Sequence, residues 1–151
     1  MIPIKGVLGA ISIMFVQSVV ADTIVSQEEV RLIVLDDLQS VRQRLLAWAE
    51  DWSRGDAEAF LDYYSDQFIS SKSLQTRAQW EKQRRQRIKP QRNIQVQLLI
   101  KELRMGPEQN SAEVFFEQNY CSKTYSDQVV KKMLWQKMNG EWYIQQESVL
   151  K

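Results

Sequence analysis

Residues 88–100 read IKPQRNIQVQLLI, and the spacing of the hydrophobic residues changes within this stretch. Before Pro90, hydrophobic residues recur at three- and four-residue steps, which is the period of a helix. After Pro90 they alternate with polar residues, which is the period of a strand with one buried face: Ile94, Val96, Leu98 and Ile100. Helices followed by strands predict an α+β fold.

Three helices are expected before Pro90. The first spans Glu28 to Arg54, and Gly55 is a residue type that commonly follows a helix C-terminus. Asp56 can cap a second, short helix, and Thr76 with Gln79 forms a Thr-x-x-Gln capping box that opens the third. One face of the first helix gathers large hydrophobic residues at helical spacing: Leu38, Val41, Leu45, Trp48 and Trp52.

Four strands joined by short turns are expected after Pro90. Gly106-Pro107 gives one turn, and Asn139-Gly140 favours a type I′ hairpin because both of its positions require a positive φ. Residues 112–120 alternate in polarity, and one face consists of Ala112, Val114, Phe116, Gln118 and Tyr120. We therefore expect three N-terminal helices packed on a curved antiparallel sheet, which forms a cone with a pocket at its open end.

The first 21 residues, MIPIKGVLGAISIMFVQSVVA, have the composition of a targeting segment. A lysine precedes an apolar stretch, and the stretch ends in small residues before Asp22, which is typical of a cleaved signal peptide. We expect a signal peptide at 1–21, a short tether at 22–27 and one domain at 28–151. The chain would then be periplasmic or secreted, with no stable membrane span. The alternative is an inner-membrane anchor formed by residues 2–21.

The composition excludes several kinds of chemistry. The chain has no histidine and one cysteine, Cys121, so His-dependent triads and multi-Cys metal clusters are absent. We expect no cofactor, no metal and no catalytic residue. Twenty basic residues face nineteen acidic ones, which disfavours nucleic-acid binding. Acidic residues dominate residues 22–66 and basic residues dominate 67–151, so the two halves are expected to neutralise each other when they pack together.

Four stretches carry a resemblance to a known family. They are WSRGDAEAFLDYYSDQF (52–68), RAQWEKQRRQRI (77–88), AEVFFEQNY (112–120) and GEWYI (140–144). In this order they resemble a nuclear transport factor two-like (SnoaL-like) domain, of the bacterial envelope subgroup that occurs alone or appended to L,D-transpeptidases. The resemblance implies a conical sheet backed by helices, and often a dimer formed through the sheet. The family includes isomerases and dehydratases as well as non-catalytic binding domains.

The candidate ligand-binding residues of the pocket are Tyr64, Phe68, Trp80, Arg84, Gln118, Tyr120 and Trp135. Arg84 is either an anion clamp or one half of a structural ion pair. Gln118 and Tyr120 either orient a ligand or bond to groups within the protein. Cys121 is expected to be a small buried residue, with pairing between two chains as the alternative.

We expect an exported, non-catalytic domain that acts as a ligand-binding or protein-assembly module in the bacterial envelope, and the resemblance implies a link to the cell wall. Its expected partners are a second copy bound through the sheet, an envelope protein or a peptidoglycan fragment. The alternative is a small-molecule isomerase or dehydratase that uses a pocket Tyr and Asp/Glu. A roomy cavity with a carboxylate beside Tyr120 would favour the enzyme, whereas a cone filled by Phe116, Met133 and Trp135 would favour the binding module.

Overall fold

The computed structural model describes residues 26–70 and 75–151. The expected signal peptide or anchor lies outside the described residues, as does the tether up to residue 25. Within the described ranges, no helix combines the length and apolar character needed to cross a membrane.

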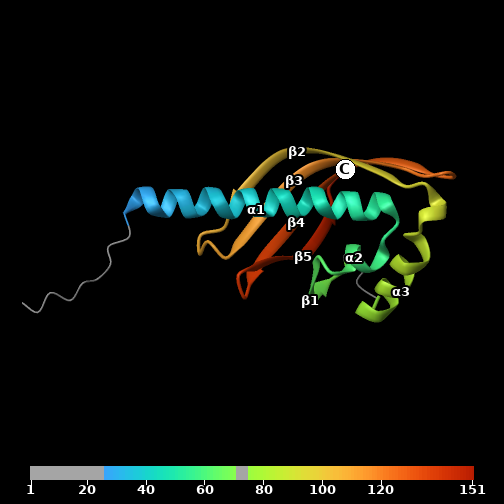
Figure 1. Ribbon diagram of the computed structural model, residues 1–151, viewed down its shortest axis with the longest axis horizontal. Helices are drawn as coiled ribbons and strands as arrows, with labels where there is room; N and C mark the ends of the chain where they lie inside the picture. The colour runs from blue at the N-terminus through green and yellow to red at the C-terminus, as the bar shows by residue number, and fades with distance from the viewer. Residues whose placement is uncertain (1–25, 71–74) are drawn as a thin grey trace, which may run out of the picture.

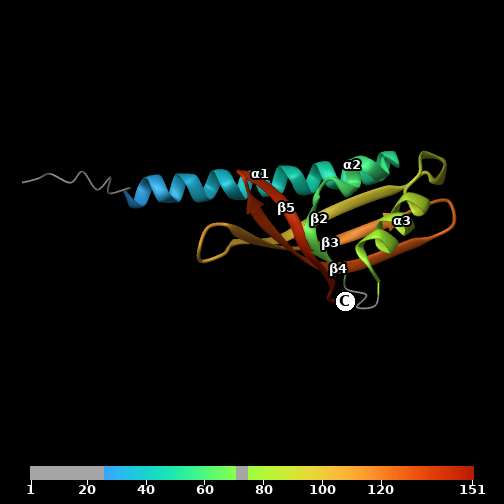
Figure 2. The same cartoon turned by 90° about the horizontal axis from the view of Figure 1, so that it is seen from below.

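The helices form where the capping residues predicted them. They are α1 (Gln27–Arg54), α2 (Ala57–Leu61), α3 (Arg77–Arg87) and a short 3₁₀ turn, η1 (Pro90–Arg92). The Asp56 carboxylate accepts a hydrogen bond from the Ala59 N–H at the start of α2, and Thr76 and Gln79 form the expected capping box at α3. The first turns of α1 extend past the sheet, and α3 lies beside the other end of α1 (Figures 1 and 2).

Five strands form one curved sheet in the order β1-β5-β4-β3-β2. They are β1 (Tyr64–Ile69), β2 (Gln95–Met105), β3 (Ser111–Cys121), β4 (Ser126–Met138) and β5 (Glu141–Val149). The last four pair antiparallel as predicted, and Asn139 and Gly140 have φ values of 52° and 84° in the β4–β5 turn. The helices and the curved sheet confirm the expected α+β architecture, although the sheet does not close into a barrel (Figure 1).

The expectation of a fully antiparallel sheet is wrong at one edge. Strand β1 lies parallel to β5, with Tyr64 opposite Ile144, and the Ile144 N–H donates to the Tyr63 carbonyl over 2.7 Å. The burial of β1 does not alternate, because two exposed residues separate its buried start from Phe68. This segment therefore lacks the period-two signal by which the other strands were recognised.

The core lies between α1 and the concave face of the sheet. Trp48 packs against Trp52, Phe60 and Phe116, with ring centroids 5.1, 5.6 and 6.4 Å away. The sheet contributes fully buried residues to this core, among them Val114, Phe116, Met133, Trp135 and Ile144. The deep part of the cone is thus filled by side chains.

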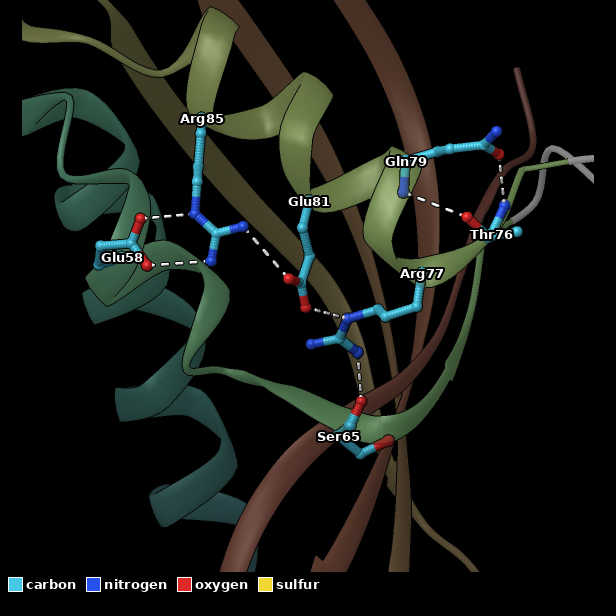
Figure 3. Close-up of polar contacts among 7 residues, drawn as sticks. All are labelled: Glu58, Ser65, Thr76, Arg77, Gln79, Glu81 and Arg85. Atoms are coloured by element: carbon cyan, nitrogen blue, oxygen red, sulfur yellow. Dashed lines mark hydrogen bonds and ion pairs between the residues drawn. The ribbon is translucent and has the colours of Figure 1, made fainter.

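Ion pairs join the acidic first half of the chain to the basic second half, as its charge distribution predicted. Lys137 on β4 contacts Asp37 on α1 over 2.6 Å. Arg85 of α3 forms a fork with both carboxylate oxygens of Glu58 on α2 and also contacts Glu81 (Figure 3). The hydrogen bond from Arg85 holds the pKa of Glu58 below its ordinary value. These contacts fix α3 against the rest of the domain.

Candidate functional site

A cavity of about 520 Å³ opens between α3 and the ends of β3 and β4. Its volume falls in the range of small-molecule sites, about 300–1,000 Å³. Four buried lining residues, together with the half-buried Arg84 beside them, form its closed end, which we call the floor: Trp52, Arg84, Ile88, Gln118 and Lys131. Its exposed lining residues form the mouth: Arg87, Arg92, Thr124, Tyr125, Asp127 and Val149.

A buried ion pair lies at the floor. The Lys131 ammonium contacts the Glu147 carboxylate, and both side chains are largely buried. The Tyr64 hydroxyl donates to Glu147 over 3.1 Å, and the Trp48 indole N–H donates to the Tyr64 oxygen over 3.2 Å. Lys131 also lies 5.6 Å from the centroid of the Trp52 ring. A continuous polar chain therefore runs from the cavity into the core.

The ionisation of Glu147 follows from its neighbours. Burial alone would raise its pKa, but the Lys131 ammonium, together with Arg84 and the Tyr64 hydroxyl, holds the pKa of Glu147 below its ordinary value. Burial and the Glu147 charge raise the pKa of the Tyr64 hydroxyl. At neutral pH the carboxylate is ionised and the phenol keeps its proton, so neither side chain is poised to exchange a proton with a ligand.

Glu147 faces the cavity side because the pairing of β4 and β5 contains a bulge. Trp135 pairs with Ile144, whereas the preceding Leu134 pairs with Gln146. The extra residue reverses which side chains point inward beyond that position. Ile144 points inward. Without the bulge, every second residue after it would also point inward, and Glu147, three residues on, would lie on the outer face.

Two polar atoms at the floor have no hydrogen-bond partner within the described residues. They are Arg84 Nε and Gln118 Oε1, both of which are buried. The Arg84 guanidinium lies 5.5 Å from the centroid of the Trp80 ring, and Gln118 is only 4% exposed. Because buried polar groups are nearly always paired, these atoms mark unused hydrogen-bonding capacity at the closed end of the cavity.

Three of the candidate residues named from the sequence line this cavity: Arg84, Gln118 and Tyr120. The other four are core residues that do not line it: Tyr64, Phe68, Trp80 and Trp135. Among these, the Tyr64, Phe68 and Trp80 rings form a cluster with centroids 4.7 to 4.8 Å apart. The filled cone expected for a binding module and the carboxylate beside Tyr120 expected for an enzyme both occur. Trp135 is buried in the deep end, and Asp127 lies opposite Tyr120 in the pairing of β3 and β4.

Lys131 is a floor residue that was not among the candidates named from the sequence, although one signal pointed to it. Lys131 is in phase with Met133 and Trp135, and a charged residue in an inward-facing strand pattern calls for a partner. The expectation that Cys121 is buried is wrong. It is exposed at the end of β3, where alternation turns it away from the face that carries Tyr120. In the described ranges, no group of three His, Cys, Asp or Glu side chains is placed to hold a metal ion.

Comparisons with known proteins give a family and a fold. A family model described as the Cds6 C-terminal NTF2-like domain matches residues 40–148. No curated protein matches the chain in sequence. Among solved structures, the helical cell-shape-determining protein Pgp2 of Campylobacter jejuni (K307A mutant) is 15% identical with a TM-score of 0.64. Bd1075 of Bdellovibrio bacteriovorus is 20% identical with a TM-score of 0.59.

A third structure, an NTF2-like protein of unknown function from Shewanella oneidensis, is 20% identical with a TM-score of 0.60. The matches cover 75%, 74% and 76% of this chain for Pgp2, Bd1075 and the Shewanella protein. They cover 40% of Pgp2, 40% of Bd1075 and 97% of the Shewanella protein, so this chain spans less than half of the first two. At these identities the likeness concerns the fold alone.

Proposed function

Because this chain belongs to the family of Cds6 C-terminal NTF2-like domains, we propose that it is a non-catalytic ligand-binding domain of the bacterial envelope. Its ligand lies in the cavity between α3 and the ends of β3 and β4. The fold alone does not decide this, since the same architecture carries both enzymes and binding domains. The chemistry of the cavity is what favours a binding function.

The observation that carries the proposal is the unpaired Gln118 Oε1 at the floor. Leaving a buried polar atom unpaired costs about 1–3 kcal/mol, and a bound ligand that supplies the partner recovers this free energy. The walls beside it are apolar, from Trp52, Ile88 and Val129. A few oriented polar groups within apolar walls are the usual makeup of a small-molecule site.

The state of the floor residues favours binding over catalysis. Glu147 is held as an ion by Lys131, so it has no proton to give, and its charge is already paired. The chain has no histidine to serve as an acid or base near neutral pH. General acid–base catalysis at the floor would need a group whose pKa lies near the working pH.

The envelope location is supported by residues 1–21 and by one structural neighbour. The N-terminal segment has the pattern of a signal peptide, and Pgp2 is described as a cell-shape-determining protein. We therefore take fragments of the cell wall as the first ligands to test. The convex side of the sheet, where Leu99 is 54% exposed, is the proposed surface for a second copy.

A second candidate function is a small-molecule isomerase or dehydratase that works at the mouth. Tyr120 pairs with Asp127 across β3 and β4, and both residues line the cavity. The hydrogen bond to Asp127 raises the pKa of the neighbouring Tyr125 hydroxyl. A carboxylate beside two phenols can accept and return a proton if a substrate reaches it.

Retention of cell-wall fragments tests the binding function. We expect the purified protein to retain specific species from a muropeptide digest of isolated sacculi, detected by mass spectrometry. Gln118→Leu should lose most of this retention because it cannot accept a hydrogen bond at the floor. Asn119→Leu, on the exposed side of the same strand, is the matched control and should bind like the wild type.

Two results would count against the binding function. If no species is retained by the wild type, the proposal fails. If the retained species is converted to product and Asp127→Asn stops the conversion, the protein is an enzyme, and the second candidate replaces the first.

A reporter fusion tests the export of the chain. Residues 1–27 fused to alkaline phosphatase, which becomes active only after translocation, should give a cell-surface or periplasmic signal. Replacing two apolar residues of the stretch 7–20 with arginine should abolish the signal, because a charged segment no longer enters the translocon. An inactive wild-type fusion, with Met1 still present on the cytoplasmic protein, would refute export.

A further inference from the structure

The floor of the cavity carries more positive than negative charge. Arg84 and Lys131 both act electrostatically on the single carboxylate of Glu147. Lys131 forms the ion pair with that carboxylate, whereas Arg84 makes no salt bridge within the described residues. Arg84 is half-buried, but its Nε–H is fully covered and lacks an acceptor, which is costly. An anionic group of a ligand would supply that acceptor.

We propose, on the premise that the cavity is a binding site, that its ligand is a peptide with a free C-terminus or an N-acyl amino acid. The terminal carboxylate lies against Arg84 at the floor, and the N–H next to it donates to Gln118 Oε1. The carboxylate supplies the missing negative charge, and the N–H supplies the hydrogen that the glutamine oxygen lacks. The ligand class thus follows from two unpaired atoms of opposite hydrogen-bonding character.

A carboxylate alone does not satisfy this site. Gln118 Oε1 is an acceptor, and an ionised carboxylate has no hydrogen to donate. The donor and the carboxylate must belong to one ligand, because Arg84 and Gln118 line the same cavity. An α-N–H, separated from the carboxylate by one carbon, meets this requirement.

A small hydroxy acid would also offer a carboxylate with a hydrogen-bond donor next to it. The rest of the cavity nevertheless favours a peptide. A volume of about 520 Å³ leaves space beyond a few heavy atoms. Ser122 and Thr124 also line the cavity, and a hydroxyl group can pair with a further amide group of a longer ligand. The exposed Arg87 and Arg92 at the mouth would attract an anionic ligand from solution.

Three matched probe libraries test this inference. All three consist of N-acetyl dipeptides and differ at the C-terminal end. The first library ends in a free carboxylate and the second in a primary amide. The third also ends in a free carboxylate, but an ester oxygen replaces the N–H of the last residue. Binding to the purified protein is measured by native mass spectrometry and by ligand-observed NMR. We expect the amides to bind at least about 10-fold more weakly than the acids, because a charge-assisted pair is lost. The ester analogues should bind several-fold more weakly than the acids.

A pair of variants on α3 assigns the effect to Arg84. In Arg84→Gln the preference for acid over amide should disappear, while far-UV circular dichroism remains that of the wild type. Lys82→Gln removes one positive charge from an exposed position of the same helix and should keep the full preference. Comparing the two variants separates a contact at the floor from a general loss of positive charge.

The outcomes distinguish this inference from the proposed function. Equal binding of acids and amides, or an unchanged preference in Arg84→Gln, overturns the inference but leaves the cavity as a binding site. Failure of all three libraries while muropeptides are still retained also overturns it. If the wild-type protein binds neither the dipeptides nor the muropeptides, the proposed function itself is overturned.

Discussion

Replacement of Gly55 with alanine is expected to lower the free energy of unfolding by about 3 kcal/mol or more. Gly55 follows α1 with a φ of 75°, a conformation that costs an L-residue about 1–2 kcal/mol. A Cβ at this position would also lie 2.3 Å from the Pro90 nitrogen and 2.4 Å from the Lys89 carbonyl carbon. These are backbone atoms, which cannot move aside as a flexible side chain would.

Gly140→Ala is the matched control for this prediction. Gly140 also has a positive φ, 84°, but an added Cβ would meet nothing within 4 Å. It should therefore show only the conformational cost, about 1–2 kcal/mol. Urea denaturation of both variants, followed by tryptophan fluorescence, measures the difference. Equal losses in the two variants would mean that the approach of Gly55 to Pro90 is not tight in solution.

The close approach at Gly55 also positions the candidate site. It joins the end of α1 to the segment between α3 and β2, where Ile88 and Arg92 line the cavity. A larger residue at 55 is expected to push this segment outward and to move α3 away from the sheet. We therefore expect any Gly55→Ala protein that still folds to bind the acidic dipeptides more weakly than the wild type.

The parts of the fold that were predictable from the sequence are those fixed by local interactions. The capping residues of α2 and α3 act within four residues, and the Asn139-Gly140 turn is determined by its own φ angles. Strand β1 differs, because its partner β5 lies far along the chain and the pairing is parallel. Nothing in the polarity of residues 64–69 indicates such a partner.

The candidate site was predictable to the extent that strand alternation determines it. The pattern of residues 112–120 placed Gln118 and Tyr120 on the inward face, and both line the cavity. Whether an aromatic residue lines a cavity or fills the core depends on where α3 docks, so the sequence alone does not tell that Phe68 and Trp80 pack against each other in the core. The Glu147 ion pair depends on a bulge that reverses the alternation of β5, and sequence periodicity cannot detect a bulge of this kind.

Lys131→Met is expected to lower the free energy of unfolding by about 3–5 kcal/mol, because it leaves the buried Glu147 carboxylate without its partner. The double variant Lys131→Met/Glu147→Leu should recover most of the loss, since an apolar pair of similar volume avoids the cost of burying charge. Chemical denaturation of the two single variants and the double variant gives the coupling energy. Additive losses would show that the two side chains do not interact in solution.

The pH dependence gives a second, independent readout of the same pair. In the wild type the pKa of Glu147 lies below its ordinary value of 4.5, so its contribution to stability is present above that pH and is lost as the pH falls through the folded-state pKa. In Lys131→Met, burial dominates and raises the pKa of Glu147 above its value in the unfolded chain. The variant should then gain stability, relative to the wild type, as the pH is lowered from neutral toward 5, because protonation removes the unpaired charge. A stability difference that stays constant over this range would mean that Glu147 is hydrated without Lys131, and that the floor of the cavity is open to water.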